Sequence, residues 1–202
     1  MPQVFRIALI VLLLLNISCL DDGTDCGSSG SQYIDVQGVS GTNVAIGNSF
    51  SDFDTLSVGA SVGFANFGIR VTPEVVFSNE ATASKGGFQA FACSPVPPQP
   101  TEEIAEIAVF SSADYSQSSS DKVFLARDTL NSIVKIYDPY SGRIVGLPDF
   151  FVEDDIVASD QPITLQLISA PLAVTEQQFT VHYRLENGEF YQFTTELIKI
   201  TP

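Results

Sequence analysis

The chain has 202 residues, of which 24 are acidic and 9 are basic, and its formal net charge at pH 7 is −15. A chain this acidic repels phosphate backbones, which excludes nucleic acid as a partner, and it has no basic patch for anionic lipid headgroups. The length suits one domain with a hydrophobic core of ordinary size.

The first element along the chain is a hydrophobic run near the N-terminus. Arg6 is followed by the apolar residues Ile7–Leu15 and then by small or polar residues, which is the layout of a secretory signal. The run is too short for a transmembrane helix, because such a helix needs about 20 apolar residues. We therefore expect a signal peptide over residues 1–18 and an exported protein.

The residues at the end of this run predict where the signal is cut. The segment Leu15-Asn16-Ile17-Ser18-Cys19 resembles a bacterial lipobox, in which the cysteine after a small residue is acylated on sulfur and becomes the new N-terminus. Ser18 fits the small position, whereas Asn16 stands where the motif usually has leucine. The resemblance implies lipidation of Cys19. Soluble secretion, with Cys19 lost or kept as a thiol, is the alternative.

The three cysteines are Cys19, Cys26 and Cys93, and an odd number in an exported chain leaves one that needs a separate role. With Cys19 lipidated, Cys26 and Cys93 remain as a pair in an oxidising compartment and are expected to form a disulfide. Closing this loop would stabilise the fold by about 4 kcal/mol on the chain-entropy estimate. No CxxC spacing and no nearby histidine supports a metal site, so we expect neither a metal nor another cofactor.

Residues 19–31 contain Asp21, Asp22 and Asp25 and then a serine- and glycine-rich stretch, which predicts a flexible acidic spacer. Acidic residues directly after the lipidated cysteine resemble the export signal that carries Bacteroidota lipoproteins to the outer face of the outer membrane. The resemblance implies an outer-membrane lipoprotein exposed on the cell surface, with the periplasmic face as the alternative. The membrane would then be contacted through the N-terminal lipid.

Residues 32–202 are expected to form a single β-sandwich domain. Several segments are short, rich in β-branched or aromatic residues, and bounded by Gly, Pro, Ser or Asp; they are Ser31–Val36, Phe67–Val71, Ile104–Phe110 and Ile163–Ile168. Their alternation of polar and apolar residues predicts sheets with one buried face. We predict a mainly β fold, an antiparallel sandwich of Ig-like or transthyretin-like topology with one or two short helices.

Two segments are candidates for these helices. Leu130, Ile133, Val134 and Tyr137 lie at helical spacing after Asp128, which predicts a helix over Asp128–Tyr137, with a strand over Ser132–Tyr137 as the alternative. A second helical turn is expected to begin near Leu147, where Pro148 suits the first turn of a helix.

A β-hairpin is predicted near the C-terminus, between Gln178–Leu185 and Phe190–Thr195. A two-residue Asn-Gly loop would mix polar and apolar residues on each face. A three-residue loop with Gly188 in a left-handed bulge instead pairs Tyr183 with Tyr191 and His182 with Gln192. This register separates the faces, so we expect it.

Residues capable of catalysis are few. A hydrolase with a histidine base would have to use His182, the only histidine, which the hairpin register places on the polar side of its strand. No Gly-x-Ser-x-Gly motif supplies a nucleophile, and the serines within Ser116–Ser120 have no base nearby in sequence. The carboxylates of Asp52, Asp54 and Glu153–Asp155 are of the type that a glycosidase or a calcium site needs, but loop acids in so acidic a chain are expected to be solvated.

Aromatic side chains could also line a binding surface, although we expect most of them in the core. Those considered are Phe88, Phe91, Tyr137, Tyr140, Phe150 and Phe151.

Several features together resemble a family of small uncharacterised Bacteroidota outer-membrane lipoproteins with a domain of unknown function. They are the lipobox-like start, the acidic spacer, the Cys-Ser-Pro segment at Cys93, and Leu167–Pro171 ahead of the Asn-Gly hairpin. The family implies no catalytic residues. The sequence therefore favours a noncatalytic cell-envelope module that binds a protein or glycan partner. A secreted-side hydrolase using His182 and a structural subunit of a surface filament are the alternatives.

Overall fold

The computed structural model describes residues 32–47, 52–79, 98–139, 141–152 and 156–202. Residues Tyr33–Ser78 and Pro98–Pro202 form one compact unit, which contains nearly all of the described residues. The expected signal peptide and spacer lie outside them, as do the predicted lipidation site Cys19 and the predicted disulfide between Cys26 and Cys93.

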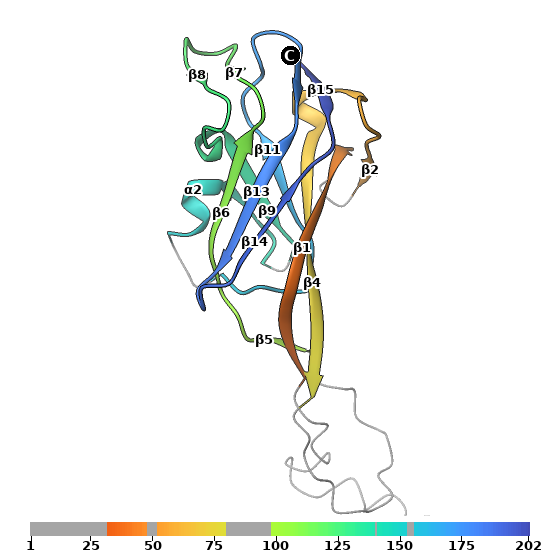
Figure 1. The fold of residues 1–202 in the computed structure, drawn as a ribbon, viewed down its shortest axis with the longest axis vertical. Helices are drawn as coiled ribbons and strands as arrows, with labels where there is room; N and C mark the ends of the chain where they lie inside the picture. The colour runs from red at the N-terminus through yellow and green to blue at the C-terminus, as the bar shows by residue number, and fades with distance from the viewer. Residues whose placement is uncertain (1–31, 48–51, 80–97, 140, 153–155) are drawn as a thin grey trace, which may run out of the picture. The chain divides into compact units, whose positions relative to one another are not determined.

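The fold is mainly β and is built from antiparallel sheets, as the sequence predicts (Figure 1). The largest sheet has the strand order β10-β9-β11-β4-β1-β2, and the short strand β5 pairs in parallel with β1. Its strands are β1 (Gln32–Ile46), β2 (Phe53–Thr55), β4 (Phe67–Asn79), β5 (Gln99–Pro100), β9 (Val134–Asp138), β10 (Arg143–Gly146) and β11 (Ile163–Leu167).

A second sheet has three antiparallel strands in the order β14-β13-β6. They are β6 (Ile104–Ser111), β13 (Phe179–Leu185) and β14 (Phe190–Thr194). Two smaller sheets complete the described part of the fold. One has the order β12-β15-β3, with β15 and β3 parallel, and the other is the pair β7-β8. Their strands are β3 (Ser61–Gly63), β7 (Tyr115–Ser116), β8 (Val123–Phe124), β12 (Thr175–Gln177) and β15 (Ile198–Thr201).

The hydrophobic core lies between the seven-stranded sheet and the sheet β14-β13-β6. Val71 and Ile136 belong to it from the large sheet, and Val181 from the smaller one; each is at least 99% buried. The rings of Phe67 and Phe179 meet across the core with centroids 5.3 Å apart. Fully burying one such side chain contributes about 1.5–3 kcal/mol. Because many side chains are buried between these two sheets, the packing of one sheet on the other is the main source of stability.

The predicted strands are present, and two are longer than the sequence indicated. The segment Ser31–Val36 corresponds to the first part of the 15-residue strand β1, and Phe67–Val71 begins the 13-residue strand β4. The segment Ile104–Phe110 becomes β6, and Ile163–Ile168 becomes β11. Alternating burial along β13 confirms that this sheet has a buried face and a more exposed face; β6 departs from the alternation at Ala108, which is buried as well.

One of the two predicted helices is wrong. Residues Asp128–Tyr137 contain only the 3₁₀ turn Asn131–Ile133, which is followed by strand β9. Val134 and Ile136 are buried at alternate positions, as in a strand with one face on the core. The strand β9 pairs with β10 on one side and with β11 on the other. The strand considered as the alternative is therefore correct over most of its length, because two-sided pairing outweighs the helical spacing. The short helix near Leu147 is confirmed as α2 (Leu147–Phe150).

The hairpin register is confirmed. Tyr183 pairs with Tyr191, and His182 pairs with Gln192. Gly188 has φ of +94°, in the left-handed region that favours glycine. The backbone N–H of Gly188 donates to the carbonyl of Leu185, which closes the three-residue loop.

Strand β1 approaches β14 closely at Gly41. A Cβ built on Gly41 would overlap the ring of Phe193 and lie 2.9 Å from the carbonyl oxygen of Arg70. No side chain fits there, since a ring on one side and backbone on the other leave no direction in which the neighbours can move.

Replacing Gly41 with alanine is therefore expected to lower the free energy of unfolding by about 1–3 kcal/mol. Urea denaturation of Gly41→Ala beside the original protein measures this. Gly38→Ala is the matched control on the same strand, because the nearest atom to its new Cβ is the flexible carboxylate of Glu74, 3.0 Å away. Equal unfolding midpoints for the two variants would contradict the packing of Phe193 against β1.

Candidate binding surface

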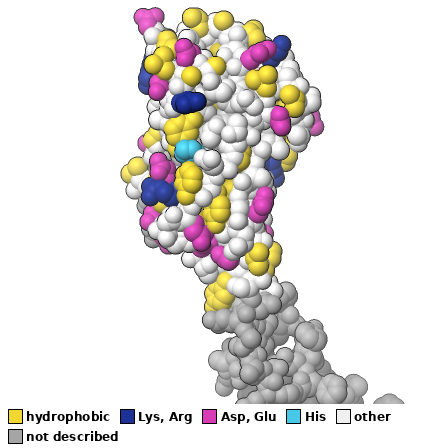
Figure 2. Space-filling view, in the orientation of Figure 1, with side chains coloured by type: hydrophobic (Ala, Val, Ile, Leu, Met, Phe, Trp, Pro, Cys, Tyr) yellow, Lys and Arg dark blue, Asp and Glu magenta, His cyan; other side chains and the backbone are white. Residues whose placement is uncertain are grey.

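An aromatic stripe crosses the outer face of the sheet β14-β13-β6. It consists of Phe110 on β6, His182 on β13 and Phe190 on β14. The imidazole centroid lies 4.5 Å from the ring of Phe110 and 5.0 Å from the ring of Phe190, the latter in a T-shaped arrangement. Phe190 is 51% exposed. Figure 2 shows the histidine in cyan with hydrophobic side chains on both sides of it.

The strand registers explain why these three rings meet. His182 lies opposite Ala108 on β6 and opposite Gln192 on β14, so Phe110 and Phe190 are its diagonal neighbours. Diagonal positions on one face of an antiparallel sheet are about 7–8 Å apart at Cα, within reach of aromatic side chains. The small Ala108 side chain leaves the space beside the imidazole open to the ring of Phe110.

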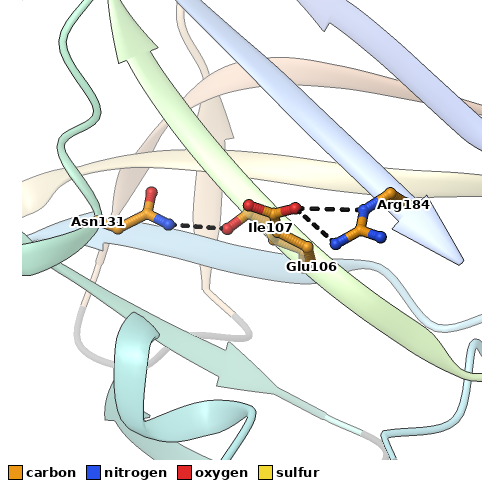
Figure 3. Close-up of polar contacts among 4 residues, drawn as sticks. All are labelled: Glu106, Ile107, Asn131 and Arg184. Atoms are coloured by element: carbon orange, nitrogen blue, oxygen red, sulfur yellow. Dashed lines mark hydrogen bonds and ion pairs between the residues drawn. The ribbon is translucent and has the colours of Figure 1, made fainter. Parts of the chain in front are cut away.

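Polar pairs border the aromatic stripe. The hydroxyls of Thr180 and Thr194 lie 3.0 Å apart and form a hydrogen bond. On the other side, the guanidinium of Arg184 donates from Nε and Nη2 to one carboxylate oxygen of Glu106, at 3.2 and 2.9 Å (Figure 3). The partners in each pair satisfy each other, so the three rings of the aromatic stripe lie between polar groups whose hydrogen bonds are already made.

The predicted position of His182 on the polar side of its strand is confirmed. It is adjacent to Gln192 across the hairpin, and Thr180 and Arg184 are its neighbours on the same face of β13. Among the described residues the imidazole makes ring contacts with Phe110 and Phe190. The threonine hydroxyls nearby bond to each other and not to the imidazole. This arrangement is that of a side chain packed on the sheet surface between two aromatic rings.

Carboxylates gather where β14 begins. The hydroxyl of Tyr191 lies 2.8 Å from both the Val36 carbonyl and the Glu189 carboxylate, and its one proton can be donated to only one of them at a time. Partial burial and the hydrogen bond to Glu189 raise the pKa of Tyr191 to about 12. The negative charges of Glu189, Glu102 and Asp35 contribute in the same direction. This end of the sheet is therefore electronegative.

A second surface feature is an open hollow beside the β7-β8 loop. It has a volume of about 470 Å³ and is lined by the serines of Ser116–Ser120 together with Asp121, Lys122, Val123 and Leu172. Ser120 Oγ donates to Gln117 Oε1 at 2.6 Å, and Ser119 Oγ lies 3.4 Å from Ser169 Oγ. Two of its hydroxyls are thus already engaged, that of Ser120 within the loop and that of Ser119 with a residue just after β11.

The acidic residues considered as metal ligands do not converge in the described part of the chain. Asp52 and Asp54 are exposed at the start of β2, and residues 153–155 lie outside the described residues. No group of three or more His, Cys, Asp or Glu side chains within the described ranges is arranged to hold a metal ion. Across the same ranges, no helix has the length and apolar character needed to cross a membrane.

The comparisons with known proteins give this chain no family. No family model and no curated protein matches it. Among the solved structures similar to it are "BspA_C_mut", with 11% identity and a TM-score of 0.26, and "Streptococcus agalactiae AgI/II polypeptide BspA C terminal domain (WT)", with 10% identity and a TM-score of 0.27. Each alignment covers 81% of this chain, and the chain spans only 46% and 49% of those proteins. TM-scores this low carry no argument about function.

The sequence reasoning did not identify Phe110 and Phe190 as surface residues. It considered other aromatic residues, of which Phe150 proves to be fully buried. The hairpin register already placed Phe190 on the face of His182, because both occupy positions of the same parity. Phe110 had no comparable signal, since the pairing of β6 with β13 joins distant parts of the chain.

The strand that carries Phe110 is held from its other side by Asn131. The side-chain amide of Asn131 accepts a hydrogen bond from the Val109 N–H at 2.9 Å and donates to the Ile107 carbonyl at 3.0 Å. Figure 3 shows Asn131 and Arg184 on opposite sides of β6. One side chain thus replaces the hydrogen bonds of a neighbouring strand.

Replacing Asn131 with alanine is expected to lower the free energy of unfolding by about 1–3 kcal/mol, because two backbone groups of β6 lose their partner. Arg184→Ala is the control on the other side of the strand. Its ion pair is about half exposed, with side chains 49% and 51% accessible, so its loss should cost at most about 1 kcal/mol. Chemical denaturation of both variants measures the two free energies of unfolding. A larger decrease for Arg184→Ala than for Asn131→Ala would contradict the assignment of Asn131 as the stronger support of β6.

Proposed function

We propose that this protein is a noncatalytic binding module of the cell envelope, held to the outer membrane by a lipid on Cys19. The observation that supports the binding role is the aromatic stripe on the outer face of β14-β13-β6. Phe190 is half exposed and lies against His182, which in turn contacts Phe110. Contiguous apolar surface with a polar rim is typical of sites that contact a protein or glycan.

The hydrolase alternative has less support from the same surface. A histidine base acts on a nucleophile within hydrogen-bond reach, and the hydroxyls that neighbour His182 on this face belong to Thr180 and Thr194, which are bonded to each other. The ring contacts of His182 give it a packing role that requires no chemistry. The filament alternative depends on self-association, which an extraction in native form would reveal.

The proposed anchor places the domain on a short tether. The described part of the domain begins at Gln32, 13 positions after Cys19 in the sequence. The flexible spacer that the composition predicts would have an end-to-end distance of about 20 Å. The acidic residues after Cys19 resemble the export signal of Bacteroidota surface lipoproteins, so we propose the cell surface as the location, with the periplasmic face as the alternative.

The parallel pairing of β1 with β5 supports the proposed disulfide. Tyr33 pairs with Gln99, and Ile34 with Pro100. Cys26 precedes Tyr33 by seven positions and Cys93 precedes Gln99 by six, so both cysteines are connected to the same point of the sheet by segments of nearly equal length. Parallel strands lie about 4.8 Å apart, so the two segments begin within reach of each other.

Mass spectrometry of the protein purified from membranes tests the anchor and the disulfide together. We expect a mature chain that begins at an acylated Cys19, and we expect Cys26 and Cys93 to resist alkylation until a reductant is added. Cys19→Ala should release the protein from the membrane fraction. An unacylated mature chain would overturn the anchor, and free thiols at Cys26 and Cys93 would overturn the disulfide, independently of one another.

Binding through the aromatic stripe is tested with Phe190→Ala on the full-length protein in mild detergent. Retention of isolated outer-membrane proteins and of glycans displayed on an array should fall at least about fivefold, because truncating an important aromatic side chain of an interface typically costs more than about 1 kcal/mol. Phe77→Ala is the matched control, since Phe77 is 47% exposed on β4. Equal losses for the two variants would mean that the stripe is not the site.

The same preparations separate the binding role from the hydrolase alternative. Turnover of generic ester, peptide or glycoside substrates that disappears in His182→Ala would replace the binding proposal with the hydrolase. Retained binding with no turnover in either protein supports the binding module.

A further inference from the structure

The two outer edges of the sheet β14-β13-β6 differ in how they are covered. The edge of β6 is covered along its length. Ile104 N–H donates to the Ile156 carbonyl, and the Asn131 side chain bonds to Ile107 and Val109. Leu130 N–H donates to the Val109 carbonyl. The edge of β14 has no such cover within the described residues, where β13 is its only paired strand.

The phase of the ladder shows which backbone groups of β14 face outward. Leu185 N–H donates to the Glu189 carbonyl at 2.9 Å, and Thr195 N–H donates to the Phe179 carbonyl at 2.8 Å. Hydrogen-bonded pairs alternate with non-bonded pairs in an antiparallel ladder. The backbone groups of Tyr191 and Phe193 therefore bond to β13, and those of Phe190, Gln192 and Thr194 point away from it. These three outward-facing residues are also the exposed ones on β14.

Strand β1 does not occupy this edge, although it is close to β14. Its contacts are with the ends of side chains: the Val36 carbonyl with the Tyr191 hydroxyl, and Gly41 with the Phe193 ring. Both side chains belong to the inward-facing set of β14. The length of a tyrosine or phenylalanine side chain thus separates the β1 backbone from the β14 backbone, which is the spacing between packed sheets and not between paired strands.

The sequence of β14 also lacks the usual protection of a sheet edge. Natural edge strands are commonly shielded by a charged residue, a proline, a bulge or a covering segment, because an open edge pairs with other chains. The strand Phe190–Thr194 contains no charged residue and no proline, and its pairing with β13 runs without a register shift. An edge of this kind is a template for one more strand.

We propose that β14 accepts an extended polypeptide segment as an additional strand, and that this segment carries Lys or Arg at both ends of an uncharged, β-forming centre. The inference rests on the proposed binding role and specifies the partner's chemistry. Main-chain bonds to Phe190, Gln192 and Thr194 provide affinity, and an apolar side chain of the segment packs on Phe190 at the end of the aromatic stripe.

The charges around β14 identify the basic ends of the partner. Glu186 and Glu189 precede the strand and Glu196 follows it, all three exposed. No Lys or Arg occurs between Arg184 and Lys199 in the sequence. Each of these two cations is already engaged, Arg184 with Glu106 and Lys199 with Glu176. Complementary charges at both ends steer association and fix the register of the segment.

A second copy of this chain fits the same edge poorly. Antiparallel self-pairing centred on Gln192 would place Glu189 of one copy opposite Thr195 of the other, next to its Glu196. Like charges at neighbouring cross-strand positions are destabilising, and the net charge of −15 on each copy adds long-range repulsion. The edge therefore favours a basic partner over itself.

The test uses a nine-residue peptide with two lysines at each end and alternating valine and threonine in the centre (KKVTVTVKK), titrated into the full-length protein in mild detergent. Two N-methylated versions carry the methyl groups on alternate amides, in opposite phases. We expect one phase to weaken binding at least about tenfold and the other to have little effect, because only one set of amides faces β14. The acidic peptide EEVTVTVEE should bind at least about tenfold more weakly than the basic one.

A variant of the protein provides the second arm. Gln192→Pro removes an outward-facing N–H while leaving the bonds between β14 and β13, since proline is tolerated in edge strands where its nitrogen faces solvent. It should abolish peptide binding, and Gln192→Ala should retain it. Amide hydrogen exchange of the unmodified protein should show new protection at Gln192 and Thr194 when the peptide is bound, a readout that does not depend on the variant's stability.

Several outcomes overturn the inference. Absence of binding by the basic peptide overturns it, as does equal weakening by both methylation phases. Self-association that Gln192→Pro abolishes would make a second copy the occupant. In each of these cases, retention of envelope components that is lost in Phe190→Ala would still support the proposed binding role, although the strand-addition inference had failed. Absence of that retention together with intact peptide binding would mean the opposite: the strand addition would stand, and the proposed binding role would fail.

Discussion

The position of β13 between β6 and β14 is the constraint on which the described surface depends. Its inward-facing residues Phe179, Val181 and Tyr183 are at least 99% buried, so a shift of one residue would turn them to solvent. The same register fixes what lies outside. It places His182 diagonal to both Phe110 and Phe190, and it sets which backbone groups of β14 bond inward. Core packing and surface chemistry are thus determined by one alignment of three strands.

The two edges of this sheet illustrate how a protein can direct pairing to one side. On β6, a single asparagine side chain and the segment that contains it supply the bonds that a strand would supply. The bonds on that side lie within the chain, and they leave little for another polypeptide to pair with. On β14, the outward backbone groups face away from the rest of the described fold. Because of this asymmetry, a further strand can pair with the sheet at one edge only, that of β14.

The sequence predicted the parts of the fold that depend on neighbouring residues. The hairpin register followed from sorting polar and apolar residues across a loop with Gly188, and the helix near Leu147 from the proline at its start. Residues Asp128–Tyr137 were harder, because Leu130, Ile133, Val134 and Tyr137 lie at helical spacing, whereas Val134 and Ile136 alternate as in a strand. The pairing of β9 with β11 decides between them, and that pairing is made by residues about 30 positions away.

The candidate site was predictable only in part for the same reason. His182 and Gln192 could be placed on one face because the hairpin is local. The contact of Phe110 with His182 joins residues 110 and 182 through a pairing of β6 with β13 that leaves no mark in either segment. The carboxylates near Tyr191 come from three separate parts of the chain, Asp35, Glu102 and Glu189. Local patterns therefore give the face of a residue, and long-range pairing gives its neighbours.

The length of β1 has a mechanical consequence. This 15-residue strand lies beside β4, which runs in the opposite direction (Figure 1), and on its other side it pairs with β5 at Tyr33–Ile34 and with β2 at Val44–Ile46. A pulling force directed along the axis of β1 strains its hydrogen bonds to β4 at the same time and not one after another. Shear of this kind resists extraction far better than peeling from a free end. A domain pulled along this strand, by flow or by an attached partner, would therefore hold its large sheet together at a higher force than a sheet opened from one end.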